Sequence, residues 1–270
     1  DFSHGNRPLP GGEVVAVWQR GWSTMILEES FLFFPSRYPE GEWNPPDLDF
    51  EDVEFRSVDG TRLHGWYVAH ERPRAVILFS HGNAGNLSHR AGTARILHEL
   101  VGATVLMYDY RGYGRSEGRP GEKGILEDGR AARAWLAERA GIDPRQVVLM
   151  GRSLGGAVAV DLARDGARAL VLESTFTSVP DMAAVHYPWL PFRQFLRNRF
   201  DSASKIKSYR GPLLQSHGDA DRIVPFEIGR RLYELANDPK RFLVIEEGDH
   251  NDPQPIEYYG ELAEFLDSLP

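Results

Sequence analysis

Short apolar runs alternate with amphipathic stretches along most of the chain after residue 50. The apolar runs predict strands at residues 53–57, 63–69, 75–80, 104–108, 147–150, 169–173, 212–216 and 242–246. The first two runs alternate apolar and polar residues around Asp59 and Gly60, which predicts an antiparallel hairpin with one solvated face. The later runs are continuously apolar, as is typical of strands buried on both faces.

The amphipathic stretches predict helices at residues 88–100, 123–140, 154–165, 226–236 and 255–269. In the second of these, Ala131, Ala134 and Trp135 mark one side and arginines mark the other. Strands that alternate with such helices predict an α/β fold with a mostly parallel sheet covered on both faces. Ligands in sheets of this kind bind beyond the carboxyl ends of the strands, where the polar motifs described below are found.

Two regions depart from this alternation. Residues 1–50 are rich in Gly, Pro and Trp and contain one predicted helix at about 13–30, so we expect an N-terminal extension packed on a main domain of residues 51–270. Residues 176–210 are rich in aromatic residues and proline, which predicts a short cap inserted over the strand ends. Six basic residues and two aspartates give this interval a net charge of +4. We favour a solvated basic face; the alternatives are contact with an anionic leaving group or with a membrane surface.

The overall composition narrows the function. The net charge of −8 argues against a nucleic-acid partner. The chain has no cysteine, which excludes thiolate nucleophiles, disulfides and thiolate zinc sites. The sequence contains neither a phosphate-binding Gly-x-x-x-x-Gly-Lys motif nor a His-Glu-x-x-His motif, and Glu117 occupies the third glycine position of a dinucleotide fingerprint that starts at Gly112. We therefore expect no cofactor and no metal.

The compartment is not fixed by the sequence. No apolar stretch approaches the length that spans a bilayer. The chain begins with Asp1 and not with methionine, so a removed N-terminal signal or anchor remains an alternative to the cytoplasmic location that we favour.

A candidate nucleophile lies in one of two Gly-x-Ser-x-Gly motifs. Residues 151–155 follow the predicted strand at 147–150 and continue into a predicted helix. Strand, tight turn and helix form the setting in which a serine is exposed above a sheet edge, and this points to Ser153. The motif at residues 114–118 continues into Pro120 and therefore into a loop, which makes Ser116 a decoy.

A serine nucleophile needs a histidine base that a carboxylate orients. Of the nine histidines, His250 lies between the last strand and the last helix, where a loop can place it over Ser153. His81 and His217 also end strands, and each is a weaker alternative because it precedes a glycine in a tight turn. Asp219 and Asp221 are both candidates for the acid, and the chain order Ser153, Asp221, His250 favours the second.

An oxyanion would need two donors that are already in place. The backbone N–H of Leu154 directly follows the nucleophile. The backbone N–H of Asn83, in the loop after the strand at residues 75–80, is the second candidate. The alternative reading of this loop is a turn that begins a helix, with Asn86 and Ser88 as caps.

Four ordered blocks resemble the α/β-hydrolase superfamily. They are His-Gly-Asn-Ala-Gly-Asn at 81–86, Asp-Tyr-Arg-Gly-Tyr-Gly-Arg-Ser-Glu-Gly at 109–118, Gly-Arg-Ser-Leu-Gly-Gly at 151–156 and His-Gly-Asp-Ala-Asp-Arg-Ile-Val-Pro at 217–225. The chain is most similar to a branch that includes bacterial esterase-like hydrolases and eukaryotic α/β-hydrolase-domain proteins, some of which remove palmitoyl thioesters. This resemblance covers about residues 50–268. It implies an eight-stranded, mostly parallel sheet and supports Asp221 as the acid.

These observations predict a serine hydrolase that cleaves small-molecule carboxylic esters through an acyl-enzyme intermediate. The short cap favours short to medium acyl chains. The alternatives are an acyl-protein or acyl-CoA thioesterase, an amidase or peptidase, and a catalytically silent binding protein. With a free histidine base required, activity should rise with pH through a pKa of about 6.5, the ordinary value for histidine.

Overall fold

The computed structural model describes residues 28–29, 32–189 and 196–269. The chain divides into two compact units, residues 1–34 and 35–270, and we treat each by itself. Within the first unit the predicted helix at 13–30 lies outside the described residues except for Glu28 and Glu29, which are helical. The rest of the description concerns the second unit.

The second unit is built on an eight-stranded sheet, as predicted. In chain order its strands are β2 (Glu51–Arg56), β3 (Arg62–Val68), β4 (Ala75–Ser80), β6 (Ala103–Tyr108), β7 (Val148–Arg152), β8 (Ala169–Glu173), β9 (Leu213–Gly218) and β10 (Lys240–Ile245). Their spatial order is β10-β9-β8-β7-β4-β6-β3-β2. Strands β2 and β3 pair in antiparallel fashion, and β3 is antiparallel to β6, whereas the other neighbours are parallel. The sheet is therefore mostly parallel.

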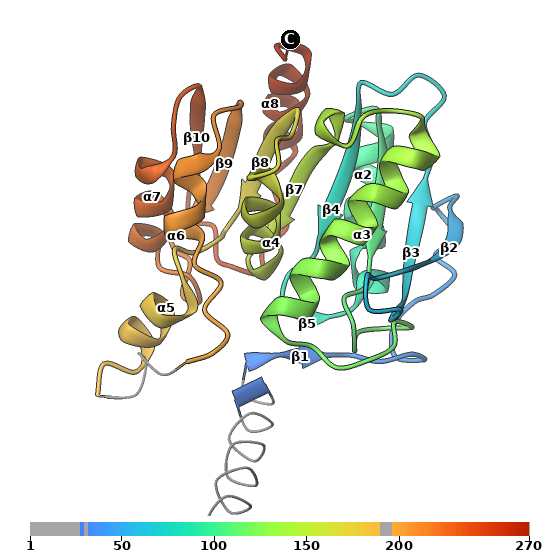
Figure 1. The fold of residues 1–270 in the computed structure, drawn as a ribbon. Coiled ribbons are helices and arrows are strands. Elements are labelled where there is room, and N and C mark those ends of the chain that lie inside the picture. Colours follow the sequence, from blue (N-terminus) through green and yellow to red (C-terminus); the bar gives the residue numbers. More distant parts are fainter. Residues whose placement is uncertain (1–27, 30–31, 190–195, 270) are drawn as a thin grey trace, which may run out of the picture. The chain divides into compact units, whose positions relative to one another are not determined.

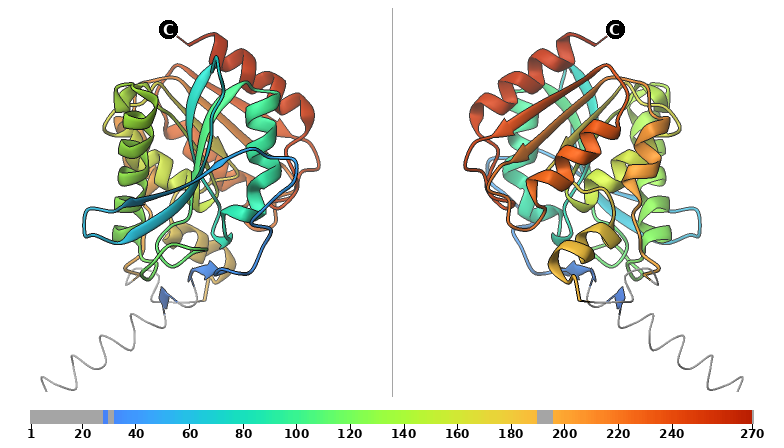
Figure 2. Two further views of the ribbon diagram at one scale, coloured as in Figure 1. Left: turned by 90° about the vertical axis from the view of Figure 1, so that its right-hand side faces the viewer. Right: turned by 90° about the vertical axis from the view of Figure 1, so that its left-hand side faces the viewer.

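Helices cover both faces of this sheet (Figures 1 and 2). Helices α2 (Ala91–Glu99) and α8 (Ile256–Asp267) lie on one face. Helices α3 (Glu122–Ala140), α4 (Leu154–Ala163), α6 (Ser202–Lys205) and α7 (Phe226–Leu235) lie on the other. The remaining short elements are β1 (Phe34–Pro35), β5 (Ala84–Gly85), η1 (Leu87–Arg90), η2 (Pro144–Gln146), α5 (Val179–His186) and η4 (Ile206–Ser208).

One large hydrophobic cluster lies between the sheet and the α2–α8 face. Ile77, Val105 and Val171 of the sheet are fully buried, and they belong to the same cluster as Leu97 of α2 and Leu262 of α8. Each large aliphatic side chain buried in this way stabilises the fold by about 1.5–3 kcal/mol. The inner strands, whose following loops carry the candidate site residues, are therefore firmly packed in the core.

The interval at residues 176–210 contains three short helices within its described part. Helix α5 lies at its start, and residues 190–195 lie outside the described residues. Farther along, α6 contacts α4 and α7, and Ser202 and Ile206 are fully buried. Residues 202–208 therefore belong to the helical layer on the sheet.

Candidate active site

Ser153 occupies the turn between β7 and α4. Its backbone has φ 52° and ψ −116°, a conformation that costs energy in a residue other than glycine. Neighbouring groups hold it there: the Ser153 N–H donates to the Glu173 carbonyl at 2.9 Å, and the Thr175 hydroxyl donates to the Ser153 carbonyl at 2.8 Å. Strained backbone that is fixed in this way is common where a side chain must be presented to a ligand.

The glycines of the turn are required by close packing. A Cβ atom at Gly151 would lie 2.1 Å from the Gly155 carbonyl oxygen, and one at Gly155 would lie 1.9 Å from the carbonyl oxygen of Ser80 in β4. Neither neighbour is a flexible side chain that could move aside. The two glycines of the Gly-x-Ser-x-Gly motif are therefore required because α4 approaches the sheet too closely here for a side chain.

Substitution of Gly155 by alanine is expected to lower the free energy of unfolding by about 3 kcal/mol or more, because α4 and β4 would have to separate. Urea denaturation measures this loss. Gly260→Ala in α8 is the matched control: no described atom lies within 4 Å of the added Cβ, and alanine favours a helix by up to about 1 kcal/mol. Equal stability of the two variants would contradict the packing described here.

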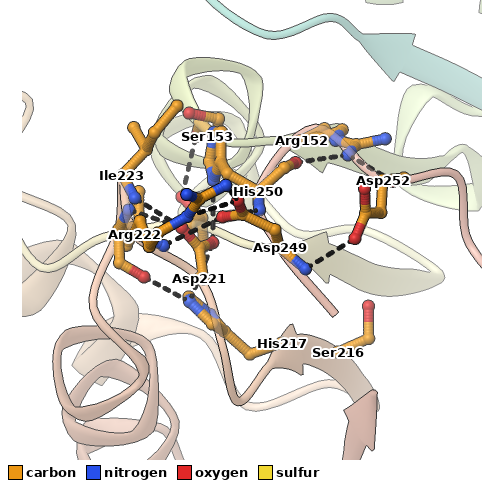
Figure 3. A network of polar contacts seen from close by, with 12 residues as sticks. Arg152, Ser153, Ser216, His217, Asp221, Arg222, Ile223, Asp249, His250 and Asp252 are labelled. Atoms are coloured by element: carbon orange, nitrogen blue, oxygen red, sulfur yellow. Dashed lines mark hydrogen bonds and ion pairs between the residues drawn. The ribbon is translucent and has the colours of Figure 1, made fainter. Parts of the chain in front are cut away.

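His250 and Asp221 form a hydrogen-bonded pair (Figure 3). Asp221 lies in the loop between β9 and α7, and His250 lies in the loop between β10 and α8. The His250 Nδ1–H donates to Asp221 Oδ2 at 2.8 Å, and both side chains are buried. When the ring is neutral, this bond leaves the lone pair on Nε2, which is then able to accept a proton.

The Asp221 carboxylate is held in its ionised form. Burial works to raise its pKa, but hydrogen bonds from His217 and His250 and from the Val224 N–H outweigh it and hold the pKa of Asp221 well below its ordinary value. The Ile223 and Val224 N–H groups donate to Oδ1 at 2.9 and 2.7 Å. An acceptor that is charged at neutral pH is what a histidine base requires as its partner.

Arg152 connects the turn of Ser153 to the loop of His250. Its guanidinium Nη2 donates to the carbonyl oxygens of His250 at 2.5 Å and Asp252 at 2.8 Å. Figure 3 shows Ser153 and Arg152 with the His250–Asp221 pair in one polar network. A side chain adjacent to Ser153 in the chain thus fixes the backbone of His250, which lies about a hundred residues away.

The weaker alternatives make other contacts. Asp219 Oδ1 accepts the Glu247 N–H at 2.7 Å and joins the loops after β9 and β10. His217 Nε2 donates to the Val224 carbonyl at 2.8 Å and lies 3.4 Å from Asp221 Oδ2. His81 Nδ1 donates to the Gly82 carbonyl at 2.7 Å, and burial lowers the pKa of His81 to about 3. Of the two candidate aspartates, only Asp221 is bonded to His250 among the described residues.

The loop at residues 81–86 lies beside the turn of Ser153. A Cβ atom built on Gly82 would be 3.8 Å from the Ser153 Cβ. The side chain of Asn83 accepts a hydrogen bond from the Tyr113 hydroxyl at 2.9 Å. Leu154 is the first residue of α4, so no preceding turn of the helix offers its N–H an acceptor. Asn86 caps η1, with its Oδ1 accepting the Ser88 N–H at 3.0 Å.

Sequence reasoning missed Arg152 and Glu173. Both end paired strands in the same register, β7 and β8. Burial raises the pKa of Glu173, and the nearby charge of Arg152 works in the opposite direction. In the sequence, the only indication of either residue is that it is charged and ends an apolar run. The groups that Arg152 and Glu173 contact come from the distant segment at residues 250–258, which the sequence does not place beside them.

The described part of the chain has neither a metal-binding cluster nor a membrane-spanning helix. No group of three or more His, Asp or Glu side chains there is arranged to hold a metal ion. Among these same residues, no helix combines the length and the apolar character needed to cross a bilayer.

Comparisons with known proteins are consistent with this geometry. Residues 71–201 match the family model described as serine aminopeptidase, S33. An uncharacterized protein of Mycobacterium tuberculosis is 41% identical over 256 residues, which cover 93% of this chain and 91% of that protein. The alpha/beta hydrolase domain-containing protein WAV2 of Arabidopsis thaliana is 37% identical, with 84% of this chain and 78% of that protein covered.

The fold also resembles solved structures. The esterase Pf2001 of Pyrococcus furiosus superposes with a TM-score of 0.71, covering 87% of this chain and 99% of that chain at 22% identity. At this identity the likeness concerns the fold alone.

Proposed function

The chain belongs to the α/β-hydrolase superfamily, and from this premise we propose that it is a serine hydrolase that cleaves carboxylic esters through an acyl-enzyme intermediate. In this proposal Ser153 attacks the acyl carbon and His250 Nε2 takes the hydroxyl proton. Asp221 orients the ring and stabilises its charged form. The alcohol leaves with the proton from His250, and water then releases the acid by the reverse sequence of proton transfers.

The proposed oxyanion donors are the backbone N–H groups of Leu154 and Asn83. The first belongs to the N-terminal turn of α4, where the helix dipole favours negative charge. The second belongs to the loop whose Gly82 approaches Ser153. Donors fixed in advance act on the charge that develops only in the transition state, and loss of one costs about 10²–10³-fold in kcat.

One observation carries the proposal: the buried bond between His250 and an ionised Asp221, tied through Arg152 to the strained turn of Ser153. A structural salt bridge would not explain why the turn holds a serine at φ 52°. Acyl transfer requires a base with a fixed tautomer and a serine hydroxyl that the base can reach.

Apolar side chains next to Asp221 support an apolar acyl group. The His186 Nε2–H donates to the Ile223 carbonyl at 2.7 Å, which joins the end of α5 to the loop of Asp221. Ile223 is 45% exposed and Tyr187 is 53% exposed. Ile223 and Tyr187 thus lie on two segments that this bond joins beside the Asp221 loop, and exposed apolar side chains near a polar site are typical of ligand binding.

A series of p-nitrophenyl esters from acetate to palmitate tests the substrate class. We expect kcat/KM to reach its maximum between about two and eight acyl carbons and to fall for longer chains, because the cap interval at residues 176–210 is short. An optimum at palmitate would contradict the preference for short and medium chains while leaving the chemistry intact.

Thioesters and amides would use the same proposed residues, and the matching family model is named for an aminopeptidase. Acyl-CoA and aminoacyl p-nitroanilide substrates, assayed beside the esters, distinguish these reactions. A folded protein that cleaves none of the three and does not react with a fluorophosphonate would instead be a binding protein.

A further inference from the structure

The block at residues 109–118 carries the second Gly-x-Ser-x-Gly motif, and the proposed chemistry gives it no role. It follows β6 and packs under the loop at residues 81–86, which we call the oxyanion loop. Tyr110 and Tyr113 of the block have no exposed surface, and Asp109 has none either. Three buried polar side chains in one turn call for a structural or functional reason.

The block bonds to the first residue of the oxyanion loop, to its middle and to the residue that follows it. The Tyr110 hydroxyl donates to the His81 carbonyl at 2.7 Å. The Tyr113 hydroxyl donates to the Asn83 side-chain oxygen at 2.9 Å. Asp109 Oδ1 accepts the N–H of Leu87, the residue that follows the loop, at 2.8 Å. The two tyrosines also pack on the His81 ring, with centroid distances of 4.4 Å for Tyr110 and 5.4 Å for Tyr113.

The block itself is rigid. The Ser116 hydroxyl donates to the Asp109 carbonyl at 2.7 Å and accepts the His64 N–H of β3 at 2.9 Å. Gly114 has φ +45°, and a Cβ atom there would lie 1.9 Å from Asp109 Oδ2. The second motif thus places a bridging serine and a compact turn under the tyrosines. A rigid support can fix the loop above it to a fraction of an ångström, which is the tolerance of an oxyanion donor.

We propose that Tyr113 is a positioning residue, which orients Asn83 so that its backbone N–H points at the developing oxyanion, while Tyr110 fixes the preceding carbonyl of His81. This inference rests on the proposed function of Ser153. Tyr113 acts through Asn83 and does not itself contact the substrate. Its effect belongs to the transition state, so its loss should lower kcat and leave KM nearly unchanged.

Tyr113→Phe tests the inference, because it removes one hydroxyl and keeps the buried ring. We expect kcat on the best ester to fall by roughly 10–100-fold with KM within about twofold of the wild type. Tyr209→Phe is the matched control. This buried tyrosine donates to the Pro212 carbonyl at 3.2 Å. Pro212 precedes the amino end of β9, whereas the oxyanion loop follows the carboxyl end of the parallel strand β4. The control variant should keep the wild-type kcat even if it loses stability.

Asn83→Ala provides a second route if Tyr113→Phe does not fold. It removes the acceptor, so kcat should fall to a similar extent, and the double variant should be no slower than the slower single variant.

The inference is overturned if folded Tyr113→Phe, or Asn83→Ala, keeps the wild-type kcat. Additive losses in the double variant overturn it as well. If Ser153→Ala still hydrolyses the ester, the proposed function fails; if only the Tyr113 and Asn83 variants behave as wild type, the positioning role alone fails.

Discussion

Replacing Ser153 with alanine is expected to lower kcat for ester hydrolysis by about 10⁶-fold, to the small residual rate that substrate binding and the oxyanion donors sustain alone. The reason is that no other nucleophile is available on the described turn to form the acyl intermediate, and His250 without it has no hydroxyl to deprotonate. The protein should still fold, because alanine tolerates this backbone no worse than serine does. Initial rates on the best p-nitrophenyl ester measure the loss, and circular dichroism verifies the fold.

Covalent labelling gives an independent readout of the same change. A fluorophosphonate should modify the wild type at Ser153 and leave Ser153→Ala unmodified. Ser204→Ala is the matched control, since this exposed serine of α6 bonds to Asp201 through its N–H and its hydroxyl and takes no part in the proposed reaction. Hydrolysis that persists in folded, purified Ser153→Ala would assign the reaction to another residue.

Asp221→Asn is expected to lower kcat by about 10⁴-fold with little change in structure. The amide preserves the shape of the carboxylate, but it removes the charge that stabilises the protonated ring of His250. It also allows the ring to adopt the wrong tautomer. The control is Asp219→Asn, two residues earlier, because its oxygen can still accept the Glu247 N–H as an amide. If Asp219→Asn carried the large loss instead, the choice between the two aspartates would be reversed.

The stability of the Asp221 variant should also depend on pH. Hydrogen bonds hold the pKa of Asp221 in the folded protein well below its value of about 4 in an unfolded chain. A lowered folded-state pKa stabilises the fold above pH 4, and this contribution is lost as the pH falls below 4. Urea denaturation should therefore show a larger difference between wild type and Asp221→Asn at pH 7 than at pH 3. An equal difference at both pH values would contradict the ionised state of Asp221.

The strands were predictable because their pattern is local. Each apolar run that predicts a strand has its counterpart in the sheet, with limits that differ by two residues or fewer, and the hairpin around Asp59 and Gly60 is antiparallel as expected. The turn of Ser153 was readable for the same reason, since strand, glycines and helix follow one another directly in the sequence.

Contacts between distant segments were not predictable. Nothing near Arg152 in the sequence indicates that its guanidinium reaches the His250 carbonyl, because the sheet order brings these loops together only in the folded chain. The block at residues 109–118 likewise carried only the family resemblance and the decoy Ser116. Its tyrosines acquire partners only when β6 is placed beside β4.

The order of the strands divides the proposed catalytic residues into two groups that differ in local stability. Ser153 and the oxyanion loop follow β7 and β4 in the middle of the sheet, whereas Asp221 and His250 follow β9 and β10 at one side. Strand β10 is the outermost of these, and its Val244 is 47% exposed. Edge strands open at lower free energies than central ones. On gentle heating, the loop of His250 should therefore open while the turn of Ser153 stays intact. Catalysis would then be lost at temperatures where the sheet is still folded, and it would return on cooling.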